Sequence, residues 1–130
     1  MSAQATLLQL YQDWRNWTEA EREAIEAGDW RRVKACQGAK SELQPRILKQ
    51  TQEAQTECQR AGVDRSVLDR QVRSVVNELI YLETRNGEFI AEQRRNAEAE
   101  LEALGRSGRN LAKIHKHYTT GAAAAWESYS

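Results

Sequence analysis

The sequence predicts an all-α protein, an elongated antiparallel helical bundle of about three long helices followed by a short C-terminal tail. Three observations lead to this class. Apolar residues recur at helical spacing along most of the chain. Glycine and aspartate stand together at two points that divide the chain into segments. Charged residues make up 29% of the chain and hydrophobic residues 40%, with one proline and one phenylalanine, which is typical of helices that bury narrow apolar stripes.

The first helix is expected from Ala3 to Ala27. Its buried face is predicted from residues that recur with a period near 3.6. These are Leu7, Leu10, Tyr11, Trp14, Thr18 and Ile25. Gly28 is expected to end this helix because glycine accepts the left-handed conformation of a C-cap, and Asp29 can cap the next helix by accepting free N–H groups. The Gly-Asp step therefore predicts a tight junction between two helices.

The second helix is expected to begin at Trp30 and to end before Gly62. Pro45 lies inside it, where proline removes a backbone donor and clashes with the preceding turn. The helix could therefore either bend there or break, with Pro45 in the first turn of a new segment. The apolar spacing stays in phase from Leu43 to Ile47, which favours a bend.

The third helix is expected after Asp64, which is placed to cap it. Its seam is predicted to contain Val67, Leu68, Val72, Val75, Val76, Leu79, Leu82, Asn86, Phe89 and Ile90. The periodicity fails at the segment from Gly105 to Gly108, which is interpreted as a helix end. A single domain is therefore predicted, with a three-helix bundle over residues 1–105 and a C-terminal tail, mobile or linked to a client, over residues 106–130.

Polar and aromatic residues within the predicted seams need separate interpretation. Asn86 occupies a seam position seven residues after Leu79. A buried asparagine there would fix the register of the helices at a cost in stability, whereas an asparagine turned to the seam edge would not, and the sequence leaves both open. Trp14, Trp17 and Trp30 lie near the first junction and are expected to fill the end of the bundle.

Charge and composition argue against several classes of partner and compartment. The 19 basic and 19 acidic residues give a formal charge of +0, so no nucleic-acid partner is expected. The sequence contains neither an apolar run of about 20 residues nor an N-terminal signal, which predicts a cytoplasmic protein without membrane insertion. Cys36 and Cys58 are expected to remain reduced on helix faces.

No residues suited to catalysis, metal binding or cofactor binding are predicted. His115 and His117 lie two positions apart, about 200° around a helix, so they cannot share a metal ion. The sequence also lacks the nucleophile elbow of hydrolases and the glycine-lysine motif of phosphate-binding loops. The chain is therefore expected not to be an enzyme, and to need neither cofactor nor metal.

The apolar residues become sparse beyond Asn86. They are Phe89, Ile90, Ala97, Leu101 and Leu104. This strip has too few expected partners within the chain to be covered. Exposed apolar strips mark interaction surfaces, so these residues are the candidate binding site for a helix of another protein.

The segment from Glu78 to Ile90, ELIYLETRNGEFI, is followed by a helix bearing glutamine and asparagine and then by Tyr118-Thr-Thr-Gly121. This order of parts resembles the FlgN family of flagellar export chaperones over most of the chain, from about Leu7 to Gly121. The chain departs from the family pattern at Pro45 and in the tract of residues 122–126, AAAAW.

The resemblance implies a cytosolic chaperone for hook-associated proteins, which form the hook–filament junction. It would keep them unassembled until they pass through the flagellar type III export apparatus. Its C-terminal half would bind the amphipathic C-terminal helix of the client, and Tyr118 would dock on the cytosolic domain of the export gate.

Two alternatives remain open. The chain could be a coiled-coil homodimer with a scaffolding role, in which case the strip would pair with the same strip of a second copy. It could also be a related export chaperone for the filament-cap protein, with similar helices and a different client.

Overall fold

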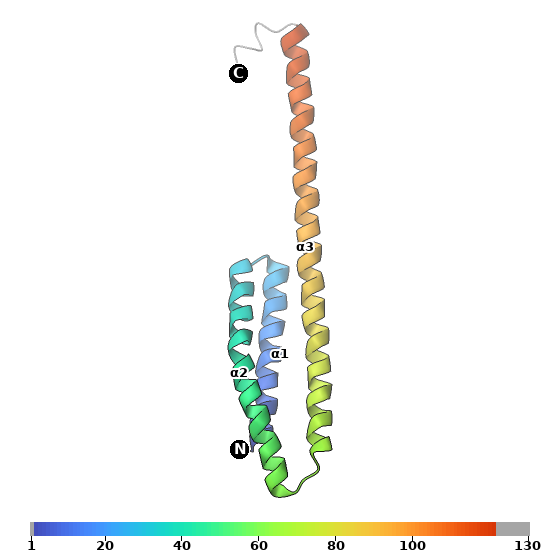
Figure 1. Cartoon of the computed structure of the whole chain (residues 1–130). Helices are drawn as coiled ribbons and strands as arrows, with labels where there is room; N and C mark the ends of the chain where they lie inside the picture. The colour runs from blue at the N-terminus through green and yellow to red at the C-terminus, as the bar shows by residue number, and fades with distance from the viewer. Residues whose placement is uncertain (1, 122–130) are drawn as a thin grey trace. The chain divides into compact units, whose positions relative to one another are not determined.

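The computed structural model describes residues 2–121, with side chains as far as residue 117, and these residues form three helices and no strand. Helix α1 comprises Ala3–Ala27, α2 comprises Trp30–Ala61 and α3 comprises Arg65–Gly121 (Figure 1). The predicted all-α class is confirmed. The tract AAAAW at residues 122–126 lies outside the described residues.

The junction between α1 and α2 follows the predicted capping chemistry. Gly28 adopts the left-handed conformation with φ of 69°, and its N–H donates to the carbonyl of Ile25 at 3.1 Å. The N–H of Asp29 reaches the carbonyl of Ala24 at 2.9 Å, and its carboxylate accepts from the N–H of Arg32 at 3.2 Å. These bonds satisfy groups left free at both helix ends.

The junction between α2 and α3 repeats this arrangement. Gly62 ends α2 with φ of 65°, and Asp64 stands directly before the first residue of α3. Its carboxylate accepts from the N–H of Ser66 at 2.9 Å and from the Ser66 hydroxyl at 2.8 Å. These two bonds favour the ionised form and hold the pKa of Asp64 below its ordinary value. The predicted cap is confirmed.

Helix α2 continues through Pro45 without a break. Its direction changes in the middle part of the helix that contains this residue (Figure 1). The ring removes one backbone donor and crowds the preceding turn, which bends a helix more readily than it ends one when the apolar face continues on both sides. Of the two alternatives at Pro45, the structure contains the continuous helix.

The described chain divides into two compact units, one ending at Ile90 and the other beginning at Ala91. In the first unit, α1, α2 and the beginning of α3 run up, down and up (Figure 1). Its buried apolar residues are Leu7, Leu10, Ala24, Ile25, Val33, Cys36, Leu43, Ala54, Leu68 and Leu79. All three helices contribute, so this unit has a core of its own.

Within the first unit, these buried residues include two packed clusters. Leu7, Ala54 and Leu68 form one cluster, with one residue from each helix. The other lies near the first junction, where Ala24, Ile25 and Val33 pack together. The seams predicted for the three helices therefore meet in one bundle.

The helix end expected at Gly105 is wrong, because α3 passes through Gly105 and Gly108 and continues to Gly121. A glycine in a helix interior costs only about 1 kcal/mol relative to alanine, and the alanine, leucine, arginine and lysine residues around both glycines favour the helix. The compact helical bundle ends at Ile90, whereas the sequence placed its end at residue 105.

The predicted packing of the tryptophans is also wrong for two of the three. Trp17 and Trp30 are 42% and 48% exposed, so they do not fill the end of the bundle. The small residues Ala24 and Val33 pack there instead, beside Ile25. Only Trp14 is half-buried against the other helices.

Candidate protein-binding site

A buried polar network joins the three helices of the first unit. Glu21 of α1, Lys40 of α2 and Asn86 of α3 are 2%, 5% and 3% exposed. The Lys40 ammonium donates to Glu21 Oε1 at 3.1 Å. The Asn86 amide donates to the same oxygen at 2.9 Å and to the carbonyl of Thr18 at 3.0 Å. Buried polar groups of this kind fix the register of packed helices, because any shift would leave them without partners.

Glu83 of α3 extends the network to the surface of the unit. Its Oε1 accepts from Lys40 Nζ at 2.7 Å, from Thr18 Oγ1 at 2.9 Å and from Trp14 Nε1 at 3.1 Å. Lys40 Nζ also lies 5.9 Å from the centroid of the Trp14 ring. Glu21 Oε2 is buried and accepts no hydrogen bond. One ammonium thus serves two carboxylates, so Lys40 is the central residue of the network.

The sequence predicted part of this network and missed the rest. Asn86 has the buried position that one of its two interpretations required. The parts that Glu21 and Glu83 play in the network were not predicted. For Glu21, the sequence spacing does indicate a buried position. Glu21 follows Thr18 by three residues and precedes Ile25 by four, which places it on the buried face of α1.

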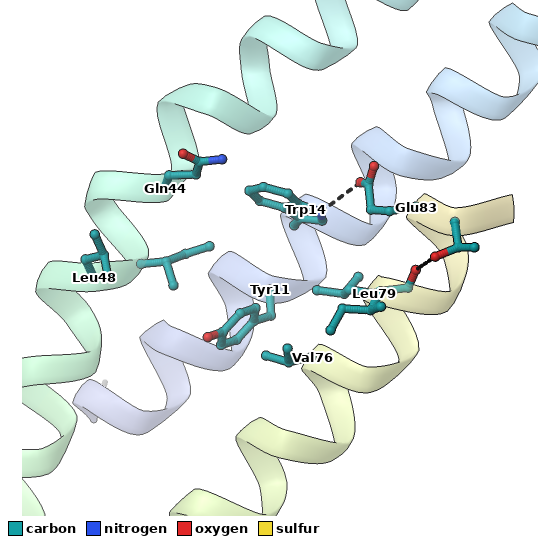
Figure 2. A pocket seen from close by; sticks show the side chains of 10 residues that line it. Tyr11, Trp14, Gln44, Leu48, Val76, Leu79 and Glu83 are labelled. Atoms are coloured by element: carbon teal, nitrogen blue, oxygen red, sulfur yellow. Dashed lines mark hydrogen bonds between the residues drawn. The ribbon is translucent and has the colours of Figure 1, made fainter. Parts of the chain in front are cut away.

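An apolar pocket of about 500 Å³ opens beside the network. Tyr11 and Trp14 of α1 lie between the side chains of the other two helices (Figure 2). The lining residues are Tyr11, Trp14, Gln44, Ile47, Leu48, Val76, Leu79, Ile80, Glu83 and Thr84. Two of them, Leu48 of α2 and Ile80 of α3, are 68% and 58% exposed. Burial raises the pKa of the Tyr11 hydroxyl, opposed by a hydrogen bond with Thr51, so this phenol stays neutral at physiological pH.

The predicted client strip is distributed over both units. Phe89 and Ile90 belong to the first unit, where they are half-buried against the cluster at the first junction. The ring of Phe89 also lies below two guanidinium groups, with the Arg22 carbon 4.8 Å and the Arg85 carbon 5.5 Å from its centroid. These two residues are therefore already engaged by neighbours within their own unit.

In the second unit, the large apolar residues of α3 are exposed. Leu101 and Leu104 are each 68% exposed, Leu111 is 67% exposed and Ile114 is 51% exposed. Together with the exposed Ala97, they form what we call the α3 strip. Leu111 and Ile114 were not included in the predicted client site, because the sequence was interpreted as ending the helix before them.

The remaining predicted residues lie near the end of the described chain. Tyr118 belongs to the backbone of α3, but its side chain is outside the described residues. His115 and His117 are exposed. No group of three or more histidine, cysteine, aspartate or glutamate side chains suited to a metal ion occurs in the described part of the chain.

The two cysteines differ in their surroundings. Both are free, with Cys36 buried and Cys58 half-buried. Burial and the nearby Glu21 carboxylate raise the pKa of the Cys36 thiol, which disfavours the reactive thiolate. Cys36 is therefore a core residue rather than a nucleophile.

The chain has no match among protein-family models, curated proteins or solved structures. No helix in the described residues is long and apolar enough to cross a membrane. The interpretation of the site therefore depends on its own geometry, which offers an apolar pocket, an exposed apolar strip and a buried polar network.

Proposed function

We propose that this chain is a helical chaperone of the FlgN type that acts in the cytoplasm on hook-associated proteins. It binds the amphipathic C-terminal helix of the client, prevents premature assembly at the hook–filament junction and delivers the client to the flagellar export gate. The observation that supports this proposal is the α3 strip, in which Leu101, Leu104 and Leu111 are each at least 67% exposed. The resemblance of the segment from Glu78 to Ile90 to the FlgN family supplies the class of client.

The strip has the residue spacing that packing against an amphipathic helix requires. Ala97, Leu101, Leu104 and Leu111 follow one another at spacings of four, three and seven residues, so they share one face of the helix. Burying one leucine side chain contributes about 1.5–3 kcal/mol. Association of two molecules costs at least about 4 kcal/mol in lost translational and rotational freedom. Three leucines thus support reversible binding, which suits a chaperone that must release its client.

The client site can be tested with two leucines of equal exposure. Leu101 in the strip and Leu48 in the pocket are both 68% exposed, so a glutamate should leave either variant folded. We expect Leu101→Glu to abolish binding of a fluorescent C-terminal segment of a hook-associated protein, measured by anisotropy, and Leu48→Glu to leave the affinity unchanged. The opposite result would move the client to the pocket. Failure of the wild-type chain to bind this segment would contradict the assignment of the client.

The same assay distinguishes the related chaperone class. A C-terminal segment of a filament-cap protein, tested beside the hook-associated segment, should bind more weakly. A tighter complex with the filament-cap segment would favour the alternative client.

Delivery is proposed to depend on Tyr118. A tyrosine combines a large apolar ring with one hydroxyl, which suits it to anchoring a small transient contact. Tyr118→Ala should therefore weaken binding to the cytosolic domain of the export gate and reduce secretion of the client, while client affinity stays at the wild-type value. Normal binding to the gate, or loss of the client as well, would contradict this separation of roles.

A further inference from the structure

The apolar pocket of the first unit has the size and the walls of a small-molecule site. Its volume of about 500 Å³ lies within the range of roughly 300–1,000 Å³ that such sites occupy in proteins. All three helices line it, and Tyr11 and Trp14 of α1 lie between the walls that α2 and α3 supply (Figure 2). An apolar molecule bound there would leave water for contact with two aromatic rings and several aliphatic side chains.

The apolar wall is short along both outer helices, which favours a compact ligand over a long helix. On α2, Leu48 shares its face with Gln44, four residues before it, and Thr51, three residues after it. On α3, Ile80 is followed by Glu83, which also lines the pocket. A helix of several turns laid across this wall would cover amide, hydroxyl and carboxylate groups, and each of them would need a new hydrogen-bond partner.

Glu83 gives the pocket a negative charge that is incompletely balanced. Among the described residues that line the pocket, Glu83 alone is charged. Its Oε1 accepts three hydrogen bonds, whereas no described residue donates to its Oε2. The ammonium of Lys40 is shared with the buried carboxylate of Glu21, so one positive charge is set against two negative charges. The Glu83 side chain is 37% exposed, which leaves its carboxylate accessible to a ligand.

From the shape and the charge of the pocket, we propose that it binds a small organic amine, a molecule with a compact apolar body and one protonated amino group. The ammonium donates to Glu83 Oε2, and the apolar body lies against Tyr11, Leu48 and Ile80. The ring faces of tyrosine and tryptophan also attract cations, so Tyr11 and Trp14 add to the preference for a positive ligand. A ligand of the same shape with a carboxylate would be repelled by Glu83. This site lies in the first unit and does not depend on the proposed client function.

Three probes that share an indole body and differ in charge test the site. They are tryptamine, which is a cation near neutral pH, the neutral alcohol tryptophol and the anion indolepropionate. Binding to the full chain is followed through the indole N–H resonance of Trp14 in a proton–nitrogen correlation spectrum, because this group donates to Glu83 Oε1 at 3.1 Å.

We expect tryptamine to shift the Trp14 resonance in a saturable way. It should bind about tenfold more tightly than tryptophol, because a hydrogen bond between charged groups is stronger than one to a neutral group. Indolepropionate should leave the resonance unchanged. Equal affinities of tryptamine and tryptophol, or no saturable shift with tryptamine, would overturn the inference.

Two substitutions remove the charge preference in different ways. Glu83→Gln keeps an oxygen acceptor and removes the negative charge, so tryptamine should bind no more tightly than tryptophol. Ile80→Lys adds an ammonium three residues before Glu83, within reach of its carboxylate on the same helix face, and should abolish tryptamine binding. Ile80 is 58% exposed, so this variant should fold even if Glu83→Gln is destabilised. The matched control is Leu101→Lys in the second unit, where an exposed apolar residue is changed in the same way and tryptamine should bind as it does to the wild type.

Far-UV circular dichroism verifies that each variant remains helical. A preference for tryptamine that survives in either folded variant, or that is lost equally in Leu101→Lys, would overturn the inference. A protein occupant is tested with the C-terminal segment of a hook-associated protein, which should leave the tryptamine-induced shift of Trp14 unchanged when added in excess. Displacement of tryptamine by this segment would assign the pocket to a partner helix and overturn the amine as its ligand.

Discussion

Replacing Lys40 by methionine removes the one ammonium group in the buried network. Lys40 is 5% exposed and lies 3.1 Å from Glu21 Oε1. Glu21 is 2% exposed, and without Lys40 its carboxylate would keep only the Asn86 amide as a hydrogen-bond donor. Removing one partner of a buried ion pair costs about 3–5 kcal/mol, because the other charge is left uncompensated. That loss is a large part of the roughly 5–15 kcal/mol that stabilises a typical domain.

Urea unfolding followed by far-UV circular dichroism measures this effect as a change in the free energy of unfolding. The matched control is Lys49→Met in the same helix, where the lysine is exposed and the change should stay within about 0.5 kcal/mol. The double variant Lys40→Met with Glu21→Leu should recover most of the loss, because no buried charge remains unpaired. Glu83 stays 37% exposed and keeps its donors Trp14 and Thr18.

Two results would refute the reasoning about Lys40. A loss below about 1 kcal/mol for Lys40→Met would mean that Glu21 does not depend on the ammonium group. A double variant less stable than Lys40→Met would mean that Glu21 contributes to stability independently of Lys40. In either case the network would not act as one unit.

Three further predictions concern other parts of the chain. Leu79→Ala should cost about 2–5 kcal/mol in urea unfolding, since Leu79 is 7% exposed, whereas Leu101→Ala should change stability by less than about 0.5 kcal/mol; equal losses would place Leu101 in a core. Cys58 should react with a thiol reagent before Cys36 in the native protein near neutral pH, because the raised pKa and burial of Cys36 suppress its thiolate, and equal rates would contradict its burial. Gly28→Ala should destabilise the chain by about 1–2 kcal/mol, because φ of 69° strains any residue with a Cβ; an unchanged thermal midpoint would contradict this.

The helix boundaries near both junctions could be predicted because capping is local chemistry. Gly28 and Asp29 lie next to each other in the sequence, and each satisfies groups within a few residues of itself. Gly62 and Asp64 act in the same way. Short-range hydrogen bonds of this kind depend on residue type and spacing alone.

The candidate site could be predicted only in part, because its contacts are non-local. The exposure of Leu101 and Leu104 follows from the lack of apolar neighbours in the sequence. The burial of Phe89 and Ile90 depends on Ala24, Ile25 and Val33, which approach only after three helices have packed. The end of α3 was missed for a different reason, since two glycines were given more weight than the helix-forming residues around them.

The polar network and the α3 strip differ in how strictly they restrict the packing of another helix. In the first unit, Asn86 and Glu21 each bond to a specific group of another helix, so the helices can pack in one register only. In the second unit, Leu101, Leu104 and Leu111 present exposed apolar surface without such polar restraints. A fixed register suits a bundle that must stay folded, whereas an exposed apolar face without such restraints suits the reversible client binding proposed above.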